Sequence, residues 1–262
     1  MKLHMTTELP DGTVIKGRVD HRPHIKRLNL DELDIKGANM LDIAANDGFW
    51  SFWARGKGAN VTAIDVDKFE DYDWGWEIPK NSGLNFSFDK SDNFKELNDK
   101  YFKYSDIRRE KLSVYDIGKL NDKFEIIFNY GLMYHLRHPL LALDKIRQNC
   151  SDEYCMINYS TITDNKLGVP YSIFLKDNAL DRAHTNWNLI NTDCMVSMMK
   201  DSGFKHIFTE KTYYNKTVFP KIFIGCSDKY FKHFSKNKNL VHHTDECFKK
   251  LNEEVTKFIY GD

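Results

Sequence analysis

The 262-residue sequence lacks the marks of several protein classes. Its five cysteines are odd in number and contain no Cys-x-x-Cys pair, which favours reduced thiols and a cytoplasmic location over a disulfide framework. The longest stretch without a charged residue, Ile126 to Leu136, is far shorter than the roughly 20 residues that cross a bilayer. The first residues contain no apolar run of signal-peptide length. We therefore expect neither a membrane span nor a secretory signal.

The sequence also lacks a net charge and any group of residues spaced as metal ligands. Lys and Arg number 38, Asp and Glu number 38, and the formal net charge is 0, which disfavours a dedicated nucleic-acid binder. No group of His, Cys, Asp and Glu has the spacing of a metal site, so we expect no metal. What is present is 41% hydrophobic and 14% aromatic residues, enough for a packed core of one large domain.

Strand-like and helix-like segments alternate along the chain. An apolar run at 39–43, helical spacing over 49–57 and a β-branched run at 61–65 form one βαβ unit, which builds parallel sheet. A short helix is predicted within 23–33. Further strands are predicted at 112–114, 124–129, 154–159, 207–212 and 218–226, with helices at 139–149 and from Thr192, as the capping residue, to 203. The pattern predicts an α/β fold with a mostly parallel seven-stranded sheet, a C-terminal antiparallel hairpin and helices on both faces.

This order divides the chain into an N-terminal cap segment (1–38), a core (39–227) and a C-terminal helical extension (228–262). Two insertions, 66–111 and 160–191, are too long to be plain connections. Both should leave the carboxyl edge of the sheet, where open α/β folds bind ligands. The last helix, 245–259, is amphipathic, and we expect its apolar face to pack on the body or on a second copy of the chain, giving a homodimer.

The turn after the first core strand has the composition of a nucleoside-binding site. Ala44 and Gly48 are small enough for a ligand to approach the backbone, and Asn46 stands where a second glycine is usual. Asp42 ends the preceding strand, and Asp65, 23 residues later, has the normal spacing for a carboxylate that accepts both ribose hydroxyls. The alternative is a plain strand–turn–helix. The incomplete G-x-G-x-x-G pattern disfavours a dinucleotide and makes a nicotinamide oxidoreductase a remote alternative.

These residues carry a resemblance. The segments 41–52 and 61–65 resemble motifs I and II of class I S-adenosylmethionine (SAM)-dependent methyltransferases. The segments 128–143 and 187–192 resemble the branch that contains the tRNA 5-carboxymethoxyuridine methyltransferase. The resemblance implies a Rossmann-like fold, SAM as cofactor and S-adenosylhomocysteine (SAH) as product. That branch uses a carboxylated SAM, but the segment 19–27 has no convincing Trp-x-Lys match, so plain SAM is expected here.

Roles follow from the resemblance position by position. It implies that Asp42, Ala44 and Gly48 shape the pocket for the methionine moiety and that Asp65 holds the ribose. Tyr115 and Asp116 flank the adenine, Asn129 and Tyr130 lie beside the sulfonium, and Tyr134 lines the ligand. Asn46 and Val66 complete the residues expected to bind the cofactor.

Catalytic and acceptor residues are hypotheses from position and chemistry. His135, after the fourth core strand, and His184, in the second insertion, are candidate general bases, and Tyr134 is a further candidate catalytic residue. Alternatively, His135 only bonds the backbone. Aromatic planes beside short polar groups suit a polyhydroxylated acceptor, unless they simply pack as a lid. We therefore expect O-methylation of a small polar acceptor such as a sugar or a nucleotide-linked glycan precursor. A tRNA-modifying enzyme and a non-catalytic SAM-binding module are the alternatives. The candidate acceptor residues are Tyr159, Tyr171, Asp181, Arg182, Asn186 and Trp187.

Overall fold

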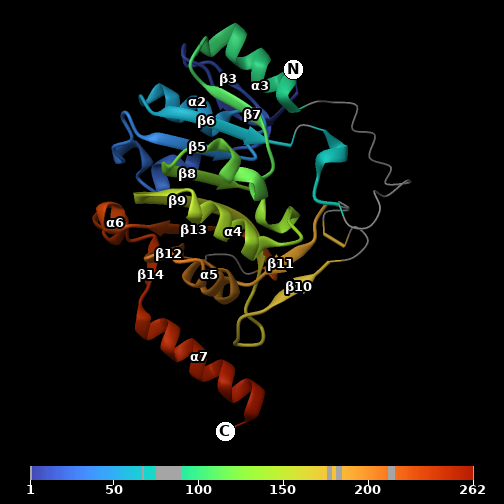
Figure 1. Cartoon of the computed structure of the whole chain (residues 1–262), viewed down its shortest axis with the longest axis vertical. Helices are drawn as coiled ribbons and strands as arrows, with labels where there is room; N and C mark the ends of the chain where they lie inside the picture. Colours follow the sequence, from blue (N-terminus) through green and yellow to red (C-terminus); the bar gives the residue numbers. More distant parts are fainter. Residues whose placement is uncertain are drawn as a thin grey trace.

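The computed structural model describes residues 2–66, 68–74, 90–175, 179–180, 185–211 and 216–261. Within these residues, the main sheet has eight strands in the order β14-β12-β13-β9-β8-β5-β6-β7 (Figure 1). Neighbours from β7 through β9 pair in parallel, whereas β13, β12 and β14 are added by antiparallel pairing. The mainly parallel α/β sheet with a C-terminal antiparallel hairpin is thus confirmed. The strands are β5 (Asn39–Ile43), β6 (Asn60–Asp65), β7 (Arg108–Lys111), β8 (Phe124–Tyr130), β9 (Cys150–Thr163), β12 (His206–Glu210), β13 (Val218–Cys226) and β14 (Leu240–His243).

The third core strand was predicted in the wrong place. Its sequence, Arg-Arg-Glu-Lys at 108–111, is charged because β7 is an edge strand with only β6 beside it. The apolar residues that suggested a strand at 112–114 instead begin the 3-10 helix η4 (Val114–Leu120). Val114, Ile117 and Leu120 recur every three residues and are all buried, which is the period of a 3-10 helix.

Three smaller predictions also need correction. The sheet has an eighth strand, because β14 in the segment expected to be helical pairs with β12. The predicted helix within 23–33 is two short pieces, α1 (Arg22–Arg27) and η1 (Leu30–Glu32), separated by Asn29 at φ 55°. Asn191, and not Thr192, caps the helix α5 (Thr192–Asp201), since its side-chain oxygen accepts from the backbone N–H of Cys194 at 2.8 Å.

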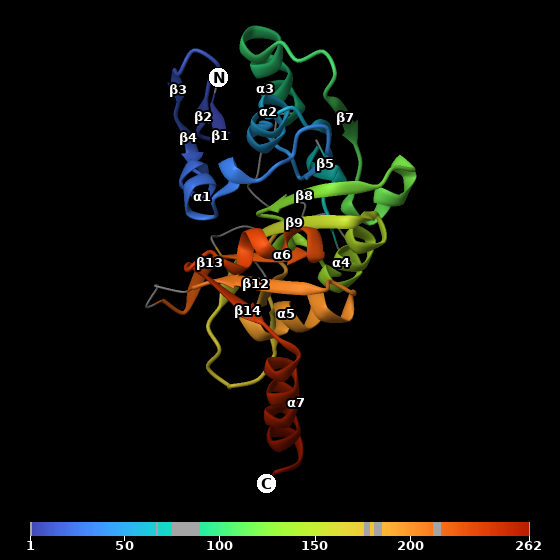
Figure 2. The same ribbon diagram turned by 90° about the vertical axis from the view of Figure 1, so that its left-hand side faces the viewer.

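Helices cover both faces of the sheet (Figures 1 and 2). The helices η4, α4 (Pro139–Gln148) and α5 pack in one hydrophobic core, and α1, α2 (Phe49–Gly56) and α6 (Asp228–Ser235) pack in the core on the other face. Beside α2, α3 (Lys90–Leu97) adds a third cluster and continues into the π-helix η3 (Asn98–Phe102). The remaining short elements are η2 (Phe69–Asp71), η5 (Met133–His135), β10 (Ser172–Phe174) and β11 (Asn188–Ile190).

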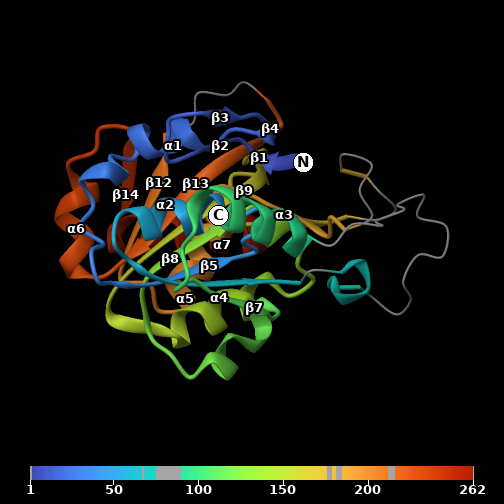
Figure 3. The same cartoon turned by 90° about the horizontal axis from the view of Figure 1, so that it is seen from above.

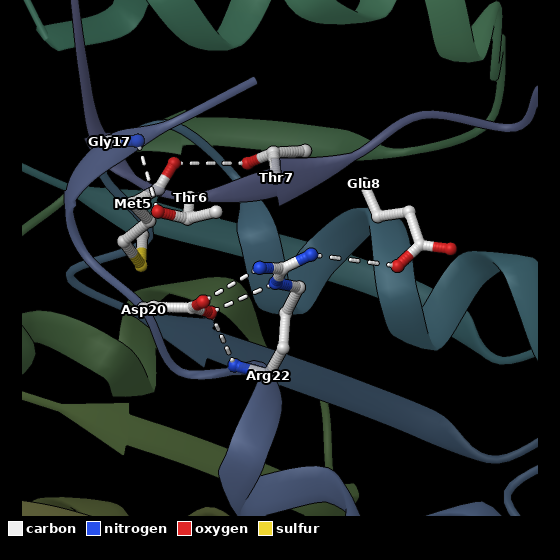
Figure 4. Close-up of polar contacts among 7 residues, drawn as sticks. All are labelled: Met5, Thr6, Thr7, Glu8, Gly17, Asp20 and Arg22. Atoms are coloured by element: carbon white, nitrogen blue, oxygen red, sulfur yellow. Dashed lines mark hydrogen bonds and ion pairs between the residues drawn. The ribbon is translucent and has the colours of Figure 1, made fainter. Parts of the chain in front are cut away.

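Four short strands at the N-terminus position α1 against the sheet: β1 (Leu3–Met5), β2 (Thr7–Glu8), β3 (Val14–Ile15) and β4 (Gly17–Val19). The backbones of β1 and β4 approach closely at Gly17, where a Cβ would lie 2.4 Å from the carbonyl carbon of Met5. Figure 4 shows that the Asp20 carboxylate accepts hydrogen bonds of 2.7 and 3.0 Å from the guanidinium of Arg22 and a third from the backbone N–H of Arg22. These contacts set the entry into α1 on one side of the sheet, with α4 and α5 on the other (Figure 3).

The last helix, α7 (Asp245–Tyr260), projects away from the rest of the chain (Figures 1 and 2). Of its apolar face, Phe248 packs against the first core, whereas Phe258 and Ile259 are each 60% exposed. The face therefore contacts the body only at its base, and the homodimer stays a prediction. No helix in the described residues is long and apolar enough to span a membrane.

Candidate functional site

The turn between β5 and α2 has a backbone that few sequences can adopt. Ala44, Asn46 and Gly48 all have positive φ, at 57°, 49° and 88°. Asn and Gly adopt this conformation readily, whereas Ala44 is strained by about 1 kcal/mol. The turn is fixed to the neighbouring strand because the backbone N–H of Asn46 donates to Asp65 Oδ2 at 2.9 Å. The structure thus brings together the residues that the sequence predicts at the ends of β5 and β6.

Asp42 lies under this turn and is 2% exposed. Its Oδ2 accepts a 2.6 Å hydrogen bond from the hydroxyl of Ser51, on the first turn of α2. Burial raises the pKa of Asp42 to about 7, with the hydrogen bond from Ser51 opposing the shift. Asp42 therefore joins strand to helix and is poised to change charge near neutral pH.

Asp47 was missed by the sequence reasoning. Its carboxylate is fully buried and accepts hydrogen bonds from the backbone N–H groups of His4 and Met5, the latter at 2.9 Å. The side-chain amide of Asn93, on α3, donates to the other carboxylate oxygen at 3.1 Å. Asp47 thus connects the turn to β1 and to α3. The only local signal is an acidic residue before the glycine that starts α2.

The first insertion reaches the expected adenine side through Asp73, which was also missed. Asp73 Oδ2 accepts from the hydroxyl of Tyr115 at 2.7 Å and from the backbone N–H of Arg137 at 2.7 Å. Burial and this hydrogen bond raise the pKa of the Tyr115 hydroxyl. Asp116 is partly exposed, with a 2.9 Å ion pair to Lys119. Tyr115 therefore ties η4 to the loop before α4.

Two residue pairs lie side by side where β8 and β9 run together. Asn129 is opposite Asn158, and its amide donates to the Asn158 side-chain oxygen at 3.0 Å, with both residues fully buried. The side-chain oxygen of Asn129 has no hydrogen-bond partner among the described residues. The next pair, Tyr130 and Tyr159, stacks with ring centroids 5.3 Å apart.

The N-terminal segment adds two buried histidines to these tyrosines. His21 and His24 lie 5.1 Å, centroid to centroid, from the Tyr159 ring, and Trp50 packs 4.5 Å from Tyr130. Burial lowers the pKa of His21 to about 4 and that of His24 to about 3, so both are neutral at pH 7. His24 Nδ1, Trp50 Nε1 and the Tyr130 hydroxyl have no hydrogen-bond partner in the described chain. This polar aromatic cluster was not predicted from the sequence.

The short helix η5 places Tyr134 and His135 after β8, with ring centroids 4.3 Å apart. His135 Nδ1 is 3.0 Å from the backbone carbonyl of Thr185. A carbonyl only accepts, so Nδ1 carries the proton and Nε2 carries the lone pair of the neutral ring. The backbone N–H of Trp187 donates to the Tyr134 carbonyl at 2.8 Å. The second insertion is thereby attached to η5.

Of the other residues predicted to bind the acceptor, Asn186 and Tyr171 both donate hydrogen bonds to backbone carbonyls. Asn186 is buried, its amide donates to the Leu180 carbonyl at 2.9 Å, and its side-chain oxygen has no partner in the described chain. The Tyr171 hydroxyl donates to the Asp164 carbonyl at 2.5 Å, which ties it to its own loop. Val66 is partly buried just after β6. The predicted residues Asp181, Arg182 and His184 lie outside the described residues.

These residues fit a nucleoside cofactor. The side-chain oxygens of Asn46 and Asn129 are buried and lack partners in the described chain, at the carboxyl ends of the strands where such a ligand binds. Asp65 adds a buried carboxylate at the same edge. Within the described residues, no group of three His, Cys, Asp or Glu side chains is placed to hold a metal ion.

Solved structures show which fold this is. The N-terminal domain of EvdMO1, solved in the presence of SAH and D-fucose, superposes with a TM-score of 0.60 over 86% of this chain and 91% of that chain, at 12% identity. A SAM-dependent methyltransferase from Mesorhizobium loti matches with a TM-score of 0.54 over 79% of this chain and 99% of that chain, at 8% identity. The chain therefore has the Rossmann-like fold of class I SAM-dependent methyltransferases. No family model and no curated protein matches it.

Proposed function

We propose that the protein is a SAM-dependent methyltransferase that O-methylates a small polar acceptor. The observation that carries this proposal is the turn after β5, whose three left-handed residues are held against Asp65 by the N–H of Asn46. In a sheet of this fold, that turn lies where a nucleoside ligand would meet both a close backbone and a ribose-binding carboxylate.

Each residue has a defined task in this proposal. Asp65 accepts the ribose hydroxyls, Asp42 and the small turn surround the methionine moiety, and Asn129 and Tyr130 line the sulfonium. Tyr115, Asp116 and Val66 flank the base and the ribose. SAM supplies a methyl group on a sulfonium and leaves as SAH. The protein's own contribution is to hold the acceptor in line, because methyl transfer is a displacement that depends on position.

His135 is the residue that we assign to the proton of the acceptor hydroxyl. Its Nδ1–H donates to the Thr185 carbonyl, which leaves Nε2 as the basic nitrogen and fixes the ring plane. A sugar is favoured because aromatic rings beside short polar groups line this region, as in the segment from Asn186 to Trp187. The EvdMO1 domain, which has a similar fold, was solved in the presence of SAH and the sugar D-fucose, and this supports the proposal of a sugar acceptor.

Calorimetric titration with SAM and SAH tests cofactor binding. We expect Asp65→Ala to weaken SAH binding about 10- to 100-fold, since it removes hydrogen bonds to a charged acceptor worth about 1.5–3 kcal/mol. Asp122→Asn, an exposed carboxylate on the amino side of β8, should bind SAH like the wild type. If the wild type binds neither compound, the proposal is wrong.

Transfer of isotopically labelled methyl from SAM identifies the acceptor class. We expect label on sugars or nucleotide sugars, and a pH profile that His135→Gln alters without changing SAH affinity. Label on tRNA with salt-sensitive binding, and none on sugars, would favour the tRNA alternative. SAH binding with no transfer to either class would favour the non-catalytic binding module.

A further inference from the structure

Arg137 is held in an unusual setting between η5 and α4, two residues after His135. Its guanidinium lies over the ring of Trp187, 5.3 Å from the centroid. Its backbone N–H is fixed by Asp73, and Nη1 is 3.5 Å from the Trp74 carbonyl, the limit of a hydrogen bond. The side chain is therefore pre-positioned at the carboxyl edge of the sheet without a strong hydrogen bond of its own.

The charge of Arg137 has no carboxylate within ion-pair distance in the described chain, although the residue is partly buried. Its Nε is buried and has no hydrogen-bond partner there. Arg22, Arg55 and Arg108 are more ordinary, since each pairs with a carboxylate at 2.7–2.9 Å. The nearby Asp73 contacts the backbone N–H of Arg137 and the hydroxyl of Tyr115, but its carboxylate forms no ion pair with the Arg137 guanidinium.

We propose that Arg137, flanked by Trp187, binds an anionic group of the acceptor, a carboxylate or a phosphate. This inference rests on the proposed function and narrows its acceptor to an acidic one. A planar guanidinium suits either group because both offer paired oxygens, and an aromatic plane preserves its orientation before the ligand arrives. The acceptor hydroxyl would face His135, and the anion would lie toward Arg137 on the same short segment.

The experiment uses the full chain saturated with SAH and three probes: D-glucuronate, uridine diphosphate and neutral D-glucose. Binding is measured by calorimetry for the wild type, Arg137→Met and Arg137→Lys. The matched control is Arg147→Met. The Arg147 guanidinium also lies over an aromatic ring, 4.2 Å from the centroid of Tyr154, near the amino end of β9. Unlike that of Arg137, its Nε has a hydrogen-bond partner, the Gly203 carbonyl.

We expect at least one anionic probe to bind more tightly than glucose, and Arg137→Met to weaken it about 10- to 100-fold, the value of a charge-assisted bidentate contact. Arg137→Lys should retain part of the affinity, and Arg147→Met all of it. Preference for glucuronate identifies a sugar acid, and preference for uridine diphosphate a nucleotide-linked acceptor. Equal binding by wild type and Arg137→Met, or no binding of either anion, overturns the inference. If the chain does not bind SAH, the proposed function is refuted. The anion affinities of the wild type and of Arg137→Met are then compared in the absence of SAH.

Discussion

Asp42 is expected to make the protein less stable as the pH rises, and a single substitution can separate this effect from that of other groups. Its pKa is about 7 in the folded chain and 3.8 without burial. Because the folded state holds this proton more tightly than the unfolded state, Asp42 stabilises least at high pH, and stability falls as pH rises from about 4 through 7. Asp42→Asn removes the titration, while the Asn side-chain oxygen still accepts the hydroxyl of Ser51.

The magnitude follows from the two pKa values. A difference of about three units corresponds to about 4 kcal/mol once the group is fully ionised. Between about pH 5 and about pH 7.5, the part lost is about 2.5 kcal/mol, because the unfolded carboxyl is already ionised at pH 5 while the folded one is not. For a chain of this size, that is about 5 to 10 °C in the melting temperature.

Buried histidines act in the opposite direction, so the comparison must be with the variant. His21 and His24 have pKa values of about 4 and about 3, and stability rises with pH while the unfolded imidazoles lose their protons. Both proteins share this contribution, which cancels in the difference. Urea unfolding should therefore show that, from about pH 5 to about pH 7.5, the free energy of unfolding of the wild type falls by about 2.5 kcal/mol relative to that of Asp42→Asn.

The control is Asp34→Asn, which removes an exposed carboxylate and should run parallel to the wild type across the pH range. Parallel curves for wild type and Asp42→Asn would refute the reasoning, because they would mean that the buried carboxyl does not titrate between pH 5 and 7.5. A wild type that loses stability relative to Asp42→Asn as the pH is lowered would show the opposite sign and would refute it equally.

Two further substitutions test the turn. Asp47→Ala should lower the free energy of unfolding by about 3 kcal/mol, because it leaves buried donors unsatisfied. In urea unfolding, Asp11→Ala should cost much less, because the Thr13 N–H that donates to Asp11 is exposed to water. An unchanged midpoint for Asp47→Ala would contradict the buried network. Gly48→Ala combines a φ of 88° with a Cβ 2.6 Å from the ring of Phe94, whereas Gly12→Ala has a φ of 83° and open space. We expect about 1 kcal/mol for Gly12→Ala and about 2 kcal/mol more for Gly48→Ala, with weaker SAH binding only in the latter, and equal costs would show that the ring moves aside.

The elements that local sequence patterns define were predicted well. Val218–Cys226 was expected with its observed bounds, and Phe124–Tyr130 within one residue, since both are rich in apolar residues, as buried strands are. The edge strand Arg108–Lys111 was missed because an edge needs no apolar run, and its charges gave no strand signal. The strand Leu240–His243 was missed because the segment was assigned to helices as a whole.

The candidate site divides in the same way. Asp42 and Asp65 were found because they lie at the carboxyl ends of their strands, Asp42 as the last residue but one of β5 and Asp65 as the last of β6, so the spacing of the two strands predicts that they meet at one edge. Asp47, Asp73 and His24 were missed because their partners lie far along the chain. Asp73 reaches Tyr115 over 42 residues and Arg137 over 64, and no periodicity encodes such contacts.

These long-range contacts give a physical role to the two insertions and to the N-terminal segment, which are additions to the core. The first insertion fixes the backbone of Arg137 through Asp73, and the second fixes His135 through Thr185. The N-terminal segment brings His21 to Tyr130, the last residue of β8, and to Tyr159, which pairs with it in β9. The turn after β5 is held by the added segments as well, because Asp47 accepts hydrogen bonds from the backbone of β1 and from Asn93 on α3. The added segments therefore support both parts of the proposed site: the N-terminal segment and the first insertion hold the turn proposed for the cofactor, and the second insertion holds His135, proposed to take the proton of the acceptor.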